Sequence, residues 1–138
     1  MYYRFDITDT AHTQQIVDKV IAEQGPVSIL VNNAGNHCKK PIEEMTVADY
    51  ESVLNVHLVG AFALTKALVP QMKANKAGSI IFMASRTSYI GQPYVAGYST
   101  AKADVYKRQD RCRCAAASQS RTCGTTRPCA AKTRCGTG

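Results

Sequence analysis

The sequence lacks any run of apolar residues that approaches the roughly 18 needed to cross a membrane. Its first residues, Met-Tyr-Tyr-Arg-Phe-Asp, also lack the basic segment and the following apolar segment of a secretory signal. With 138 residues the chain is too short for two sizeable cores, and its 45% hydrophobic and 20% charged residues are typical of a globular protein. We therefore expect one soluble, cytoplasmic domain without a membrane partner, which excludes a two-domain enzyme.

Aliphatic residues are missing from the C-terminal part of the chain. After Val105 there is no Val, Ile, Leu, Phe or Met, and such a segment cannot form a core. Residues 1–103 carry nine Lys/Arg and eight Asp/Glu, a net charge of +1, whereas residues 104–138 carry eight Lys/Arg and two Asp, a net charge of +6. Five of the six cysteines also lie after residue 103. We predict a partial domain over residues 1–103 and a disordered, basic, cysteine-rich tail over residues 104–138.

The junction itself has an unusual sequence. Asp104-Val-Tyr-Lys-Arg-Gln109 resembles a translated sequencing adaptor, because GAT GTG TAT AAG AGA CAG encodes these residues. This resemblance predicts that the native sequence ends near Ala103.

Two other interpretations of the tail are a zinc module and a nucleic-acid-binding arm. Cys112 and Cys114 are separated by one residue, and no histidine follows them, whereas structural zinc sites usually pair Cys-x2-4-Cys units. A basic tail binds phosphate nonspecifically, but only Tyr106 is available to stack on a base. We therefore expect no metal site and no specific nucleic-acid partner.

Short apolar runs alternate with helical patterns across residues 1–103. The predicted strands are Tyr2–Phe5, Val27–Val31 and Ser79–Ala84. The predicted helices span about Thr10–Glu23, Thr46–Lys73 and Tyr94–Lys102. Strands that alternate with helices imply right-handed βαβ crossovers and a parallel sheet covered on both faces. The predicted fold class is therefore α/β.

Three residues suggest acid/base chemistry near the end of this domain. Tyr98 and Lys102 are four residues apart and therefore share one face of a helix. An ammonium group near a phenol favours the phenolate, which makes a tyrosine usable as a general acid/base. Ser85, at the carboxyl end of a predicted strand, could donate a hydrogen bond to a carbonyl oxygen held by the same tyrosine. Each feature alone is also compatible with an ordinary surface lysine or a turn hydroxyl.

The combination of motifs resembles the short-chain dehydrogenase/reductase family. In chain order the matching features are Asp6 followed by Ile7, Asn32-Asn-Ala-Gly35, Ser85, and Tyr98-x3-Lys102. The resemblance covers about residues 2–103 without a gap in motif order. It implies a partial Rossmann-like fold, a doubly wound parallel sheet of which the chain would hold about three strands.

The resemblance also implies an activity, which is hydride transfer between NAD or NADP and a small-molecule alcohol or carbonyl substrate. It assigns proton transfer and a contact with the cofactor to Tyr98, and polarisation of the carbonyl oxygen to Ser85. To Lys102 it assigns both support of the phenolate and binding of the nicotinamide ribose. Asn33, Ala34 and Gly35 would line the cofactor path, and Asp6 with Ile7 would contact the adenine ring. The complete parent protein is expected to be a homo-oligomer.

Three departures from the family pattern stand out. His57 occupies the position of a helix asparagine that anchors a proton-relay water in the family, so it is either a tentative relay residue or a packed core histidine. The glycine-rich phosphate loop is absent, and so is everything after Ala103 that would form the substrate pocket. We therefore expect a middle fragment that is inactive as given. The alternative is a noncatalytic family relative or binding module with a basic, cysteine-rich tail.

Two loops could face a substrate, residues 36–40 and residues 88–94. Lys39 and Lys40 could favour an anionic substrate such as a sugar acid, or they could form a solvated pair.

Overall fold

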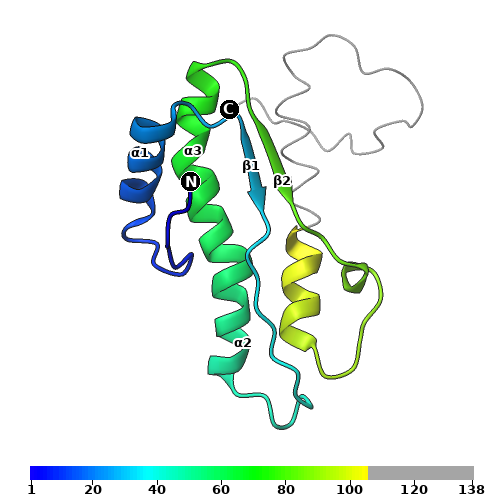
Figure 1. Ribbon diagram of the computed structural model, residues 1–138. Coiled ribbons are helices and arrows are strands. Elements are labelled where there is room, and N and C mark those ends of the chain that lie inside the picture. Colours follow the sequence, from blue (N-terminus) through cyan, green and yellow to red (C-terminus); the bar gives the residue numbers. More distant parts are fainter. Residues whose placement is uncertain (106–138) are drawn as a thin grey trace, which may run out of the picture.

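The computed structural model describes residues 1–105, and these residues form an α/β unit with a parallel two-stranded sheet (Figure 1). In chain order the elements are α1 (Thr13–Gln24), β1 (Ile29–Asn32), α2 (Val47–Leu54), the π-helix η1 (Asn55–Gly60), α3 (Ala61–Ala74), β2 (Ser79–Phe82) and the 3-10 turn η2 (Arg86–Ser88), followed by a helix over residues 96–105. In the sheet, Leu30 lies opposite Ile80. The predictions made for the tail cysteines and for Tyr106 lie outside the described residues.

Two of the three predicted strands form, and Tyr2–Phe5 does not. Residues 1–6 have no regular secondary structure, and within residues 1–105 β1 pairs with β2 alone. A strand needs a hydrogen-bonded neighbour, so the aromatic run has nothing to pair with here.

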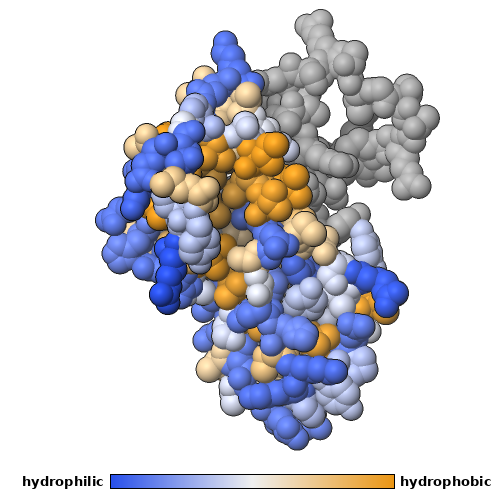
Figure 2. Space-filling model, in the orientation of Figure 1, coloured by the Kyte–Doolittle hydropathy of each residue, from blue (hydrophilic) through white to orange (hydrophobic). Residues whose placement is uncertain are grey.

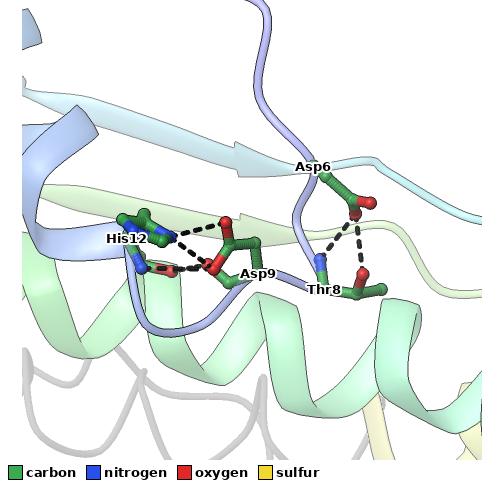
Figure 3. Close-up of polar contacts among 5 residues, drawn as sticks. Asp6, Thr8, Asp9 and His12 are labelled. Atoms are coloured by element: carbon green, nitrogen blue, oxygen red, sulfur yellow. Dashed lines mark hydrogen bonds and ion pairs between the residues drawn. The ribbon is translucent and has the colours of Figure 1, made fainter.

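Helix α1 begins three residues later than the pattern predicts, because local side-chain contacts hold the preceding residues in turns. The Asp6 carboxylate accepts hydrogen bonds from the Thr8 amide and hydroxyl, at 2.9 and 2.8 Å (Figure 3). The Asp9 carboxylate contacts the His12 ring at 2.7 Å and accepts a hydrogen bond from its amide at 3.3 Å. Such Asx turns compete with helical hydrogen bonds, so the helix starts only at Thr13.

The sequence pattern predicts a sheet covered on both faces, but within residues 1–105 only one face packs on helices and the other is exposed. Val17 of α1, Leu30 of β1, and Leu68 and Met72 of α3 form one buried cluster. On the opposite face, Ile29, Val31 and Ile81 are exposed, and Figure 2 shows hydrophobic side chains gathered over the two strands. The helix over residues 96–105 joins the covered side, where Val105 packs with Ala61 and Phe82. Val105 lies two residues beyond the predicted end of the domain.

The long central helix begins at a capping box. The Thr46 hydroxyl accepts a hydrogen bond from the Asp49 amide, and the Asp49 carboxylate accepts one from the Thr46 amide. Asp stands here at the position where a capping box usually has Glu or Gln. Lys40 also donates to Asp49, at 2.8 Å. The hydrogen bond from Lys40, aided by those from Thr46, holds the pKa of Asp49 well below its usual range.

Within residues 1–105, the continuous helix Val47–Ala74 is the one segment long and apolar enough to cross a membrane, judged by length and composition alone. This helix contains no long uninterrupted apolar run, because single polar residues divide its sequence. Its 18-residue window nevertheless has a mean hydropathy of 1.5. The core helix of a soluble protein meets the same criterion, and Leu68 and Met72 of this helix pack against α1 and β1.

Gly60 allows the chain near Ile7 to lie directly against the central helix. A Cβ at Gly60 would lie 2.5 Å from the Ile7 carbonyl oxygen, so Gly60→Ala must displace backbone. We expect Gly60→Ala to lower the free energy of unfolding by about 1–3 kcal/mol, the usual cost of overpacking. Gly91→Ala is the control, because its Cβ would meet nothing within 4 Å. Urea denaturation of both variants, followed by circular dichroism, checks this. Equal stability of the two variants would contradict the packing described.

Candidate active site

A cleft of about 490 Å³ opens where the carboxyl ends of β1 and β2 meet the helix over residues 96–105. Parallel strands end at the same edge of a sheet, so the residues that follow them converge there. The cleft is lined by Asn33, Gly35, Asn36 and His37 after β1, by Met83 and Ala84 after β2, and by His57, Tyr98 and Lys102.

Tyr98 and Lys102 both line this cleft from one helix, as their spacing predicts. The Lys102 Nζ lies 5.5 Å from the centroid of the Tyr98 ring. The same Nζ donates a hydrogen bond of 2.6 Å to the Met83 carbonyl oxygen. Only 6% of Lys102 is exposed, and burial lowers the pKa of Lys102. The carbonyl therefore holds a largely desolvated ammonium beside the phenol.

His57 is a buried, hydrogen-bonded histidine that also reaches the cleft. Its Nε2 lies 2.8 Å from the Asn36 carbonyl oxygen. A carbonyl can only accept, so Nε2 carries the proton, and Nδ1 is left as the acceptor of the neutral ring. The His57 ring also contacts the Tyr98 ring edge-on, with centroids 5.4 Å apart and planes at 80°.

The surroundings of His57 favour its neutral form. Burial is the main cause that lowers the pKa of His57, and the nearby Lys102 and His37 act in the same direction. The hydrogen bond to Asn36 opposes them only in part.

Gly35 makes the position of the His57 ring possible. A Cβ at Gly35 would lie 2.5 Å from the Cε1 atom of His57, which is closer than real Cβ contacts. His57 also belongs to the π-helix η1, an irregular turn of a kind that is frequent at functional sites. Glycine on one side and the π-turn on the other together bring the imidazole to the cleft.

The structure brings Asn33, Gly35, His57, Tyr98 and Lys102 together, but not the other predicted site residues. Those outside the lining of the cleft are Ser85, Asp6, Ile7 and Ala34. The Ser85 hydroxyl accepts a hydrogen bond from the Thr87 amide at 3.3 Å and caps η2. Hydrogen bonds from Thr8 lower the pKa of the Asp6 carboxyl.

His37 and Met83 are site residues that sequence reasoning did not single out. The His37 ring contacts the Tyr98 ring edge-on, with centroids 5.6 Å apart and planes at 76°. Its only signal was its place in the loop over residues 36–40. Met83 acts through its carbonyl, a group that every residue has, so no sequence signal could have marked it.

Comparisons with known proteins identify sequence and structural relatives of this chain. A sequence profile of the family described as short chain dehydrogenase matches residues 1–135. The chain is 39% identical over 100 residues to a 2-dehydro-3-deoxy-D-gluconate 5-dehydrogenase of Formosa agariphila. This match covers 72% of this chain and 38% of the relative. It is also 34% identical over 103 residues to a 3-oxoacyl-acyl-carrier-protein reductase of Thermotoga maritima. This second match covers 75% of this chain and 42% of the relative.

Two solved structures share the fold. A short-chain dehydrogenase from Streptomyces avermitilis matches with a TM-score of 0.79 and 28% identity, over 84% of this chain and 43% of that one. A gluconate 5-dehydrogenase from Burkholderia cenocepacia, in complex with NADP and tartrate, matches with a TM-score of 0.74 and 30% identity, over 80% of this chain and 43% of that one. These matches confirm the predicted partial Rossmann-like fold. The chain spans about two fifths of the length of these relatives.

The contacts of His57 predict how it titrates. We expect its ring to titrate below the ordinary value of about 6.5, and Lys102→Met to raise its pKa by removing a neighbouring positive charge. Lys39→Met, the same change at an exposed lysine, is the control. Proton NMR of the histidine rings checks both variants. The folded state should also lose stability as the pH falls from about 6.5 through the folded pKa of His57, because burial disfavours the protonated ring. An unchanged His57 titration in Lys102→Met would contradict the geometry.

Proposed function

Because the chain belongs to the short-chain dehydrogenase/reductase family, we propose that it carries the catalytic side chains of an NAD(P)-dependent oxidoreductase that interconverts an alcohol and a carbonyl compound. The observation that carries this proposal is the placement of the Tyr98 phenol and the buried Lys102 ammonium on one wall of a cleft at the ends of β1 and β2.

The residues of the cleft fit the nicotinamide-ribose end of NAD or NADP. The Lys102 ammonium, the Tyr98 hydroxyl and the Asn33 amide are donors suited to ribose hydroxyls and a carboxamide. Gly35 leaves its stretch of the lining free of side chain. When bound, NAD or NADP supplies the carbon that accepts or donates the hydride.

Tyr98 is the general acid/base of the proposed reaction. In the oxidation direction its phenolate takes the proton of the substrate hydroxyl while the hydride leaves the same carbon, and the reduction reverses both transfers. Lys102 stabilises the phenolate electrostatically. Ser85 would polarise the carbonyl oxygen, since accepting from the Thr87 amide leaves its own hydroxyl hydrogen available to donate.

His57 is proposed as the relay residue behind Tyr98. Its Nδ1 accepts a hydrogen bond in the neutral ring, because Nε2 already donates to Asn36. The asparagine that stands at this position in the family can accept through its amide oxygen, so imidazole and amide can hold the same water molecule.

The binding-module alternative has less support in the described residues, because the cleft gathers Tyr98, Lys102 and His57 in an arrangement suited to proton transfer. Its basic, cysteine-rich tail lies outside those residues. A small-molecule substrate, a cytoplasmic location, a homo-oligomeric parent, and the absence of nucleic-acid and membrane partners remain predictions.

Removal of one hydroxyl tests the role of Tyr98. In a full-length protein that contains residues 1–103, we expect Tyr98→Phe to lower turnover by about 10² to 10⁴-fold, the usual contribution of general acid/base catalysis. Cofactor binding should weaken far less, because Lys102 and Asn33 still hold the cofactor when the Tyr98 hydroxyl is lost. Lys102→Ala should impair both. Tyr94→Phe, which removes the same hydroxyl from an exposed ring, is the matched control. Steady-state kinetics and calorimetric titration with NAD and NADP measure the two effects. A Tyr98→Phe enzyme with nearly normal turnover would refute the proposal.

A pair of substitutions distinguishes relay from packing at His57. If Nδ1 holds a relay water, His57→Asn keeps substantial turnover and His57→Leu loses it, although Leu suits the buried position. If His57 only fills the core, Leu leaves turnover unchanged. Either variant frees the Asn36 carbonyl, at a cost of about 1–3 kcal/mol in stability. Turnover and melting temperature are therefore measured together, and normal turnover of a folded Leu variant rules out the relay.

A further inference from the structure

Three basic side chains converge on Tyr98, and the cleft contains no acidic one. Of the residues that line it, Lys102, His57 and His37 are basic, and none is Asp or Glu. We propose that the substrate of this site carries a carboxylate, and that His37 binds it while Tyr98 holds the reacting hydroxyl or carbonyl. This inference rests on the proposed function.

Two of the three basic groups already have partners. The Lys102 ammonium donates to the Met83 carbonyl, and the N–H of His57 donates to the Asn36 carbonyl. Both side chains are also buried. The His57 ring has no further N–H, because Nε2 carries its one proton. The Lys102 ammonium has two N–H groups left, and the proposed function uses these for the nicotinamide ribose. Neither side chain is then left to bind a second polar group of the substrate.

His37 differs from them in both respects. It is exposed at the cleft, and within residues 1–105 its ring makes no hydrogen bond. Its contact with Tyr98 is an edge-on ring contact that leaves the ring nitrogens available. An imidazole presents at least one N–H donor in either protonation state, and a hydrogen bond to a carboxylate is among the stronger kinds.

The distance between the two rings allows one substrate to reach both. The His37 and Tyr98 ring centroids are 5.6 Å apart, so a small molecule with a carboxylate and a reacting oxygen a few carbon atoms apart can contact both side chains. The cleft of about 490 Å³ also has to hold the nicotinamide. A short hydroxy acid, and the oxo acid formed from it, fit both constraints.

The adjacent lysines do not account for anion binding. Lys40 is paired with Asp49 at 2.8 Å, which neutralises it away from the cleft. Lys39 is exposed and does not line the cleft. The loop over residues 36–40 therefore selects an acid through His37. Lys39, two residues further along the same loop, is the control.

Matched substrates isolate the carboxylate. The test uses a full-length protein that contains residues 1–103 and a series of sugar acids and polyols paired by chain length, with D-gluconate and D-sorbitol as the first pair, since these differ only in a carboxylate or a hydroxymethyl group at C1. We expect the unmodified enzyme to prefer the acid, and His37→Ala to lower its kcat/KM for the acid by about tenfold or more, mainly through KM. The value for the polyol should change little, and His37→Lys should retain part of the preference.

Lys39→Ala, the control, should leave the ratio of the two kcat/KM values unchanged. A preference for polyols, an equal loss toward both substrates in His37→Ala, or an unchanged ratio would overturn the inference while leaving the dehydrogenase assignment intact. Absence of turnover toward every acid and polyol, with NAD and NADP both supplied, would also overturn this inference, whereas the proposed function is tested separately by Tyr98→Phe.

Discussion

Burial of the Lys102 ammonium at the carboxyl end of β2 is the constraint on which the site depends. A charged group removed from water needs a strong partner, and the Met83 carbonyl supplies it at 2.6 Å. That hydrogen bond joins the helix over residues 96–105 to the end of a strand nineteen residues earlier. Because Tyr98 lies one turn before Lys102 on the same helix, the contact that satisfies the lysine also places the phenol at the cleft.

A second constraint is steric and acts from the opposite wall. The His57 ring lies against the backbone of Gly35, where any Cβ would enter the ring. The Asn36 carbonyl then takes the Nε2 proton, and burial keeps the ring neutral by lowering the pKa of His57. Packing and hydrogen bonding thus define which nitrogen of His57 carries the proton, and a backbone carbonyl orients the ring.

The three basic side chains of the cleft differ in their hydrogen bonds. Lys102 and His57 each donate a hydrogen bond to a backbone carbonyl. The Lys102 ammonium lies beside the Tyr98 phenol, and the His57 ring packs against it. The His37 ring makes no hydrogen bond within residues 1–105, and it contacts the Tyr98 ring edge-on from the loop that follows β1. Two hydrogen-bonded basic side chains and one without a hydrogen bond within residues 1–105 therefore line the same cleft.

The sequence by itself determined the α/β class, two strands, and the place of Tyr98 and Lys102 on one helix, because these follow from periodicity and spacing along one chain. Its motifs also carried the resemblance that predicted the family. The sequence also predicted both ends of the central helix to within one residue. Helix α1 begins three residues later than predicted, because the carboxylates of Asp6 and Asp9 accept hydrogen bonds from backbone amides that precede the helix. Only the tertiary structure decided that His37 meets Tyr98, that the Met83 carbonyl holds Lys102, and that His57 is both buried and at the cleft. These contacts join residues far apart in the chain through backbone carbonyls and ring packing, and neither leaves a pattern in the order of the amino acids.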